Sequence, residues 1–168
     1  MKRLPYVLAT FLLLVIPAQL LAKGETVKIT IKGADLKAPI EITDPKVLTE
    51  FQVWTGPGTS SSAPGFNPNA PGFIVDWSQT VAEPPKGLHR YEVSFYAKVP
   101  NERLVYVVFY EYDPATENGY IYLPGSADES YWLNMGTISR GVEGKWFRAW
   151  SVWESVARPL IADTKGRA

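Results

Sequence analysis

Alternating apolar and polar residues predict β-strands along most of the chain. In Thr26–Lys32, Val27, Ile29 and Ile31 alternate with lysines and threonine, which is typical of a strand with one buried face. Similar alternation, or a short apolar run between turn residues, predicts the other strands. These are Ile40–Ile42, Phe73–Trp77, His89–Val99, Leu104–Tyr112, Tyr120–Leu123, Tyr131–Arg140 and Lys145–Trp150.

Two of these segments have the pattern of a β-hairpin. His89–Val99 alternates cleanly, while Leu104–Tyr112 is apolar on both faces, as expected of a central strand that is covered on both sides. Between them, Pro100-Asn101-Glu102 has the composition of a turn. The pattern in Tyr131–Arg140 is less regular, and there we predict a strand with a bulge at Gly136.

Capping residues predict two short helices. Asp44 is a suitable N-cap, and Pro45 occupies the first helical position, where proline is tolerated. Near the other end of the chain, Ser151 is the predicted cap of a helix over Val152–Ala157. Pro159 is expected to end that helix.

The predicted elements indicate one β-rich domain. The segment 56–72 is rich in glycine, proline and serine and carries no charge, so we predict a long loop inside the domain. The fold class is therefore mainly β, or α+β. We expect a single antiparallel β-sandwich or a rolled sheet over residues 23–168, with one or two short helices.

The N-terminus has the order of features found in secretory signal peptides. Met1-Lys2-Arg3 is positively charged, Val7–Ile16 is a ten-residue apolar run, and Ala22 supplies a small residue for cleavage. A membrane-spanning helix needs about 20 apolar residues, and a proline interrupts this run well before that. We expect a signal peptide over residues 1–22, export to the periplasm or the medium, and a mature chain that begins at Lys23 or, alternatively, follows cleavage at Ala18.

Composition and charge exclude several classes of function. Without Lys2 and Arg3 the chain has 15 basic and 17 acidic residues and no block of like charge, so neither nucleic acid nor an anionic membrane surface is an expected partner. The absence of cysteine excludes a lipidated N-terminal cysteine, thiol catalysis and thiolate metal sites. His89 is the sole histidine, and we interpret it as structural or solvated. No cofactor or metal is expected.

Carboxylates are the best candidates for catalytic groups. Glu111 and Asp113 lie two residues apart, so on a strand they project from the same face with Cα atoms about 6.6 Å apart. Asp76 is a third candidate. Paired carboxylates act as acid and base in glycoside hydrolysis, so a hydrolase acting on glycan is our alternative hypothesis. In the simpler interpretation, Asp113 begins a turn and Glu111 is a charged residue at the end of a strand.

Aromatic residues favour our first hypothesis, a non-catalytic domain that binds a small molecule, a glycan or a protein in the bacterial envelope. Exposed rings stack on sugars and anchor peptides, although more often such rings complete a core. A third hypothesis is a structural role in assembly, with the 56–72 loop as the contact. The candidate binding residues are Trp54, Trp77, Tyr120, Tyr122 and Trp132.

Several short phrases of the sequence resemble a group of exported bacterial proteins for which no activity is known. These phrases are Gly33-Ala-Asp-Leu, Pro39-Ile-Glu-Ile-Thr-Asp-Pro45, Phe73–Ser78, Tyr120-Ile-Tyr-Leu-Pro-Gly125 and Gly144-Lys-Trp. The resemblance extends over most of the chain after residue 22. It implies bacterial export and one folded unit, and it assigns no site.

Overall fold

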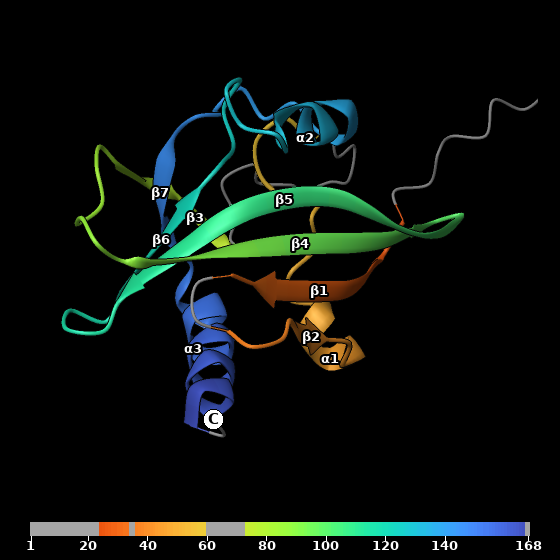
Figure 1. Ribbon diagram of the computed structural model, residues 1–168. Coiled ribbons are helices and arrows are strands. Elements are labelled where there is room, and N and C mark those ends of the chain that lie inside the picture. Colours follow the sequence, from red (N-terminus) through yellow and green to blue (C-terminus); the bar gives the residue numbers. More distant parts are fainter. Residues whose placement is uncertain (1–23, 34–35, 60–72, 167–168) are drawn as a thin grey trace, which may run out of the picture.

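Seven strands form one antiparallel sheet in the order β2-β1-β4-β5-β6-β7-β3 (Figure 1). The computed structural model describes residues 24–33, 36–59 and 73–166. The predicted antiparallel, mainly β fold is confirmed, and its strands form a single open sheet rather than the two layers of a sandwich. The strands are β1 (Thr26–Lys32), β2 (Ile40–Ile42), β3 (Val75–Val81), β4 (His89–Val99), β5 (Asn101–Asp113), β6 (Asn118–Tyr122) and β7 (Trp146–Ala149).

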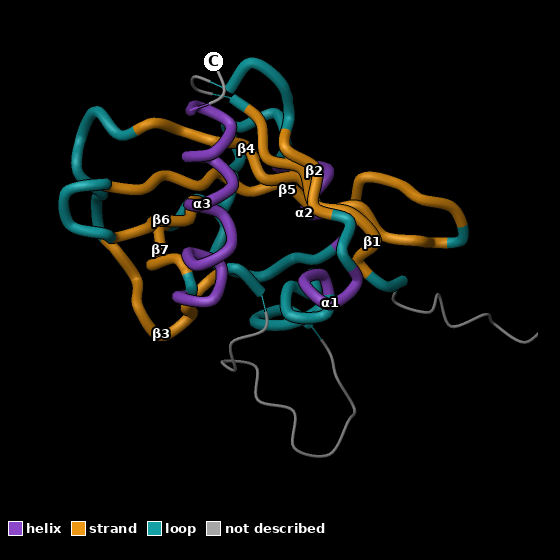
Figure 2. Tube along the Cα trace, turned by 90° about the horizontal axis from the view of Figure 1, so that it is seen from below, coloured by secondary structure: helices purple, strands orange, loops and turns teal. Residues whose placement is uncertain are grey.

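Within the described ranges, three helices pack against the sheet, one more than expected. They are α1 (Pro45–Leu48), α2 (Tyr131–Thr137) and α3 (Ser151–Gly166). Figures 1 and 2 show α1 and α3 on one face of the sheet and α2 on the other. The expected signal peptide over 1–22 and the part of the predicted loop at 60–72 lie outside the described residues, so both remain predictions.

The predicted β4–β5 hairpin is confirmed and is longer than expected. Its register runs from Val99 opposite Asn101 to His89 opposite Tyr112. Because side chains alternate along a strand, every second residue of each strand faces α3, and these residues form the centre of the core. They include Tyr91, Val93 and Phe95 from β4 and Tyr106, Val108 and Tyr110 from β5, all of them fully buried.

The C-terminal helix contradicts the prediction that Pro159 would end it. Helix α3 continues through Pro159 to Gly166. Trp153, Ala157 and Ile161 are fully buried at intervals of four residues, so one stripe of the helix packs on the sheet. A proline inside a helix costs about 3 kcal/mol. Pro159 is exposed, so its ring avoids the core, and we attribute the continuity of the helix to burial of this stripe.

The prediction of a strand over Tyr131–Arg140 is also wrong, because residues 131–137 form helix α2. The burial pattern has a helical period: Asn134 and Ile138, four residues apart, are buried, while Trp132 is exposed. Gly136 is therefore an exposed helical residue and not a strand bulge.

Candidate functional site

The sheet face opposite α3 carries a row of charged and aromatic side chains across five strands. Residues paired across antiparallel strands point to the same face. The register places Arg90 opposite Glu111, Glu111 opposite Tyr120, Tyr120 opposite Arg148, and Arg148 opposite Asp76. The row therefore alternates cations and carboxylates around one buried tyrosine.

A second row, here called the outer aromatic row, runs beside the first and consists of Phe109, Tyr122 and Trp146. The ring centroids of Phe109 and Tyr122 are 6.4 Å apart, and those of Tyr122 and Trp146 are 4.9 Å apart. The Arg90 guanidinium lies 5.4 Å from the Phe109 ring and 5.6 Å from the Trp146 ring. These rings are half-buried and pack mainly on one another, so they form a small second core on this face.

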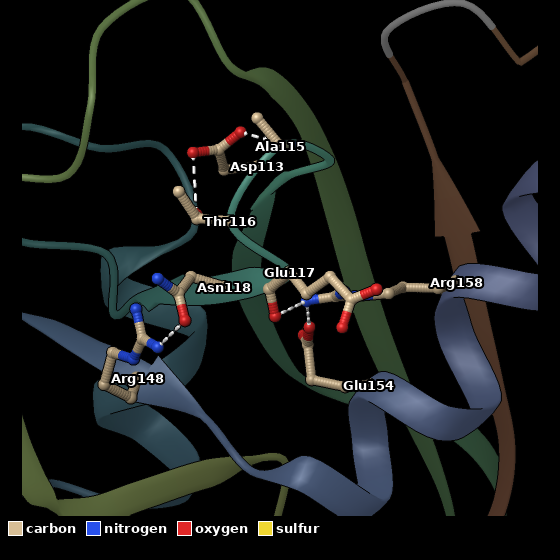
Figure 3. Close-up of polar contacts among 8 residues, drawn as sticks. All are labelled: Asp113, Ala115, Thr116, Glu117, Asn118, Arg148, Glu154 and Arg158. Atoms are coloured by element: carbon tan, nitrogen blue, oxygen red, sulfur yellow. Dashed lines mark hydrogen bonds and ion pairs between the residues drawn. The ribbon is translucent and has the colours of Figure 1, made fainter.

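The three carboxylates predicted as catalytic do not converge. Glu111 is buried and accepts a 2.7 Å hydrogen bond from Arg90 Nε. The oxygens of Asp113 accept hydrogen bonds from the Ala115 backbone and the Thr116 hydroxyl, so Asp113 stabilises a turn (Figure 3). Asp76 lies three strands from Glu111, which is ~14 Å at the usual spacing of strands. Carboxyl pairs in glycosidases are separated by about 5–9.5 Å.

The five aromatic residues predicted to bind a ligand also lie in different parts of the molecule and do not form one patch. Trp77 belongs to the core and is 8% exposed. Trp54 is half-buried, and its ring nitrogen donates to the Gly24 carbonyl. Tyr120 and Tyr122 lie on the face of the two rows, where the Tyr122 hydroxyl donates to Asp128. Trp132 projects from α2 and is 74% exposed, the largest exposure of any large apolar side chain in the described residues.

A cleft of about 610 Å³ opens where β7 passes into α3, beside the first residues of β6. We call it the α3 cleft. Eight of its twelve lining residues have polar or charged side chains, and the other four include Trp150 and Pro159. The polar and charged residues are Asp76, Gln79, Glu117, Arg148, Ser151, Glu154, Ser155 and Arg158.

The wall of the cleft formed by α3 carries an ion pair. Arg158 bonds to the Glu154 carboxylate one turn before it and also to the backbone carbonyl of Glu117 (Figure 3). Gly119 makes room for this carboxylate, because a Cβ atom at position 119 would lie only 1.9 Å from Glu154 Oε1. Glycine at this position is therefore required by the placement of Glu154.

Three buried polar atoms of this wall lie together without a hydrogen bond of ordinary geometry within the part of the chain that the structure describes, although the Tyr110 hydroxyl interacts with both Glu154 and Arg158. They are Glu154 Oε1, Arg158 Nε and the hydroxyl oxygen of Tyr110. Tyr110 is fully buried, and its hydroxyl and the Glu154 carboxylate interact electrostatically. Buried polar atoms without well-formed hydrogen bonds cost free energy, so this part of the wall is not optimised for stability alone.

Two carboxyl groups of the cleft have pKa values shifted in opposite directions. Burial raises the pKa of Glu154, and the Tyr110 hydroxyl and the cations Arg158 and Arg148 only partly oppose this effect. Partial burial acts to raise the pKa of Asp76 too. Hydrogen bonds from Ser78 and Gln79 outweigh it and hold the Asp76 pKa below its usual value.

Arg148 connects the α3 cleft to a second cavity. This cavity, of about 560 Å³, lies between residues 83–86 and the sheet, and both Arg148 and Tyr120 line it. The Arg148 guanidinium lies 5.1 Å from the Tyr120 ring and donates to the Asn118 side chain (Figure 3). Arg148 forms none of the salt bridges among the described residues, but its charge acts on the carboxylates of both Asp76 and Glu154.

Sequence analysis found Asp76 but missed the other charged residues of this cleft. One signal was present: Glu154 and Arg158 are four residues apart, the spacing of an ion pair on a helix. Glu117 and Arg148 carry no local signal, because only the register of β6 and β7 brings them to α3. His89, the sole histidine, is exposed at the start of β4 and away from the cleft lining.

Comparisons with protein-family models, with curated proteins and with solved structures give no match to this chain. Within residues 24–33, 36–59 and 73–166, no group of three or more acidic or histidine side chains is placed to hold a metal ion. None of the helices in the same ranges is long and apolar enough to cross a membrane. The function must therefore be inferred from the geometry of the cleft.

Proposed function

We propose that the protein is an exported saccharide-binding domain and that the α3 cleft is its binding site. The observation that carries the proposal is the lining of the cleft, in which carboxylates, guanidinium groups, an amide and hydroxyls surround one tryptophan. Ligand sites fix orientation with a few placed polar groups. A lining this polar matches a ligand that presents hydroxyl groups on most of its surface.

Trp150 supplies the apolar contact that such a ligand needs. Its ring is half-buried at the start of α3, and Phe51 holds it in an edge-to-face contact with a centroid distance of 6.1 Å. A fixed ring offers a flat apolar surface at low entropic cost. Sugars combine apolar ring faces with hydroxyl edges, so Trp150 and the surrounding polar side chains complement both.

The position of Arg148 favours an oligosaccharide over a single sugar. Arg148 lines both the α3 cleft and the neighbouring cavity beneath residues 83–86. A ligand that follows the two cavities would pass this guanidinium, which has donors for ring oxygens, hydroxyls or an acidic substituent. Export by the expected signal peptide would bring the domain to the compartment where the glycans of the envelope lie.

Isothermal titration calorimetry tests the proposal. The probes are hexasaccharides of β-1,4-linked glucose, of β-1,4-linked N-acetylglucosamine and of galacturonic acid. We expect saturable binding of at least one probe, and a loss of about tenfold or more in affinity for Arg148→Ala, because one charge-assisted hydrogen bond contributes about 1.5–3 kcal/mol. Trp132→Ala, far from the cleft lining, is the matched control and should bind normally. Equal binding by wild type and Arg148→Ala would contradict the proposal.

A further inference from the structure

We infer, on the basis of the function proposed above, that the bound oligosaccharide carries a carboxylate and that Arg90 binds this group at a second subsite on the outer face of the sheet. The ligand class is therefore an oligosaccharide with an acidic sugar unit. Three neighbouring side chains fix the Arg90 guanidinium and leave its two terminal nitrogens exposed to a ligand.

The Arg90 guanidinium is held by one carboxylate and two rings. Its Nε atom donates a 2.7 Å hydrogen bond to Glu111, whose side chain is only 8% exposed. The guanidinium carbon lies 5.4 Å from the centroid of the Phe109 ring and 5.6 Å from that of the Trp146 ring. Because these contacts set the orientation of the group before a ligand arrives, binding costs little further side-chain entropy.

The two terminal nitrogens of Arg90 remain for a ligand. In the described ranges, Nε is the one nitrogen of this side chain that forms a hydrogen bond with the protein. The side chain is 51% exposed. Its terminal nitrogens lie in one plane and can donate two parallel hydrogen bonds to the two oxygens of a carboxylate. A neutral hydroxyl group offers neither the second oxygen nor the charge, so this fork favours an acidic group.

A continuous path leads from the α3 cleft to Arg90. A cavity of about 300 Å³ lies beside Arg90 and is lined by residues 83–86 and by Trp146. Residues 83–86 also line the cavity of about 560 Å³ that Arg148 connects to the α3 cleft. The register places Arg90 and Arg148 in one row, three strands apart, which is ~14 Å at the usual strand spacing. A linear saccharide of several units can span this distance.

The two ends of this path differ in their attraction for a carboxylate. In the α3 cleft, the charges of both arginines act on carboxyl groups of the same cleft, so that end favours a neutral sugar unit. Beside Arg90, Lys86 adds a second cation. The carboxylates there are Glu83, which is exposed, and Glu111, which is buried and already bonded to Arg90. Trp146 lines this cavity and offers an apolar contact to the sugar ring.

Two forms of one oligosaccharide provide the test. The acid form is a β-1,4-linked hexasaccharide in which N-acetylglucosamine alternates with N-acetylmuramic acid, so every second unit carries a carboxylate. In the amide form, these carboxyl groups are primary amides. Calorimetry with the full chain measures both affinities. We expect the acid form to bind about tenfold or more tightly than the amide form, because charge-assisted hydrogen bonds to a carboxylate are stronger than neutral ones.

Arg90→Lys is the test variant, because it keeps a positive charge beside Glu111 but removes the fork. It should lose most of the preference for the acid form and bind the amide form as the wild type does. Arg103→Gln removes an exposed arginine elsewhere on β5 and is the matched control, which should keep the preference. A second measurement needs no variant: added sodium chloride should weaken binding of the acid form by the wild type and affect the amide form much less.

The outcomes separate this inference from the proposed function. Equal affinity of the wild type for the two forms, or a preference that survives in Arg90→Lys, would overturn the role of Arg90 and leave saccharide binding by the α3 cleft standing. A preference for the acid form that depends on Arg90, with an affinity that Arg148→Ala leaves unchanged, would support the Arg90 subsite and contradict the α3 cleft. Absence of binding for both forms and for the three probes above would overturn both.

Discussion

The side-chain amide of Asn134 forms both hydrogen bonds that a neighbouring strand would otherwise give to the backbone of Val107. The Val107 N–H donates to Asn134 Oδ1 at 2.8 Å, and Asn134 Nδ2 donates to the Val107 carbonyl at 2.7 Å. Strand β6 pairs with β5 only from Phe109 onward. Asn134 therefore continues the hydrogen bonding of β5 beyond the end of β6 and fixes α2 to the sheet.

Replacing Asn134 by alanine should destabilise the protein by about 2–4 kcal/mol. The substitution leaves a buried N–H and a buried carbonyl unpaired, and each such group costs about 1–3 kcal/mol. Urea unfolding followed by tryptophan fluorescence measures the change. Asn101→Ala, at the exposed first residue of β5, is the control and should change the free energy of unfolding by less than about 0.5 kcal/mol. Equal stability of the two variants would contradict this role of Asn134.

Arg140 should make a large contribution to the stability of the protein. It is 4% exposed, and its guanidinium donates to the carbonyls of Val53, Thr55 and Pro57 and to the Tyr106 hydroxyl. Arg140→Met keeps much of the apolar volume but removes every donor. We expect a loss of about 3–5 kcal/mol, the range for a broken buried polar network. A thermal melt within 2 °C of wild type would show that the segment 53–57 needs no such anchor.

Gly119 and Glu154 should be energetically coupled. Gly119→Ala places a methyl group where the Glu154 carboxylate lies, and overpacking of this kind costs about 1–3 kcal/mol. In a Glu154→Ala background the methyl group has space, so the same glycine substitution should cost much less. A double-mutant cycle of unfolding free energies measures this coupling. Additive effects would mean that the two residues are not in contact.

The stability of the protein should depend on pH through Glu154. Its pKa in the folded state is raised above the ordinary value of 4.5, so the folded protein binds the proton more tightly than the unfolded chain does. The resulting stabilisation is complete below about pH 4.5 and is lost as the pH rises through the folded-state pKa. Glu154→Gln should therefore become more stable relative to wild type as the pH rises from 4.5 to 7. Urea midpoints at several pH values measure the difference, and a constant difference would contradict the raised pKa.

The sheet could be predicted because its signals are local. Alternation in β1, β4 and β5 lies within each strand, and the turn between β4 and β5 has its own composition. The two errors arose where tertiary packing outweighed local preference. Pro159 lies on an exposed face of a helix that three buried residues hold in place, and α2 is held by the buried amide of Asn134.

The cleft could not be predicted because its parts are distant in sequence. Asp76, Glu117, Arg148 and Glu154 lie on four segments that only the strand order β6-β7-β3 and the turn into α3 bring together. No local motif in the sequence distinguishes these four charged residues from charged residues on an ordinary protein surface. Glu154 is distinguished by its burial against Gly119. Gly119 lies at that place only because of the register in which β6 pairs with β5.

The most direct test of the central claim, that the α3 cleft is the binding site, is a two-dimensional ¹⁵N NMR titration of the protein with the hexasaccharide that binds best. The account predicts that the largest shift changes occur at the backbone amides of Gly119, Arg148 and Ser155, which line the cleft. Changes confined to the outer aromatic row or to α2 around Trp132, or no changes at saturating ligand, would contradict it.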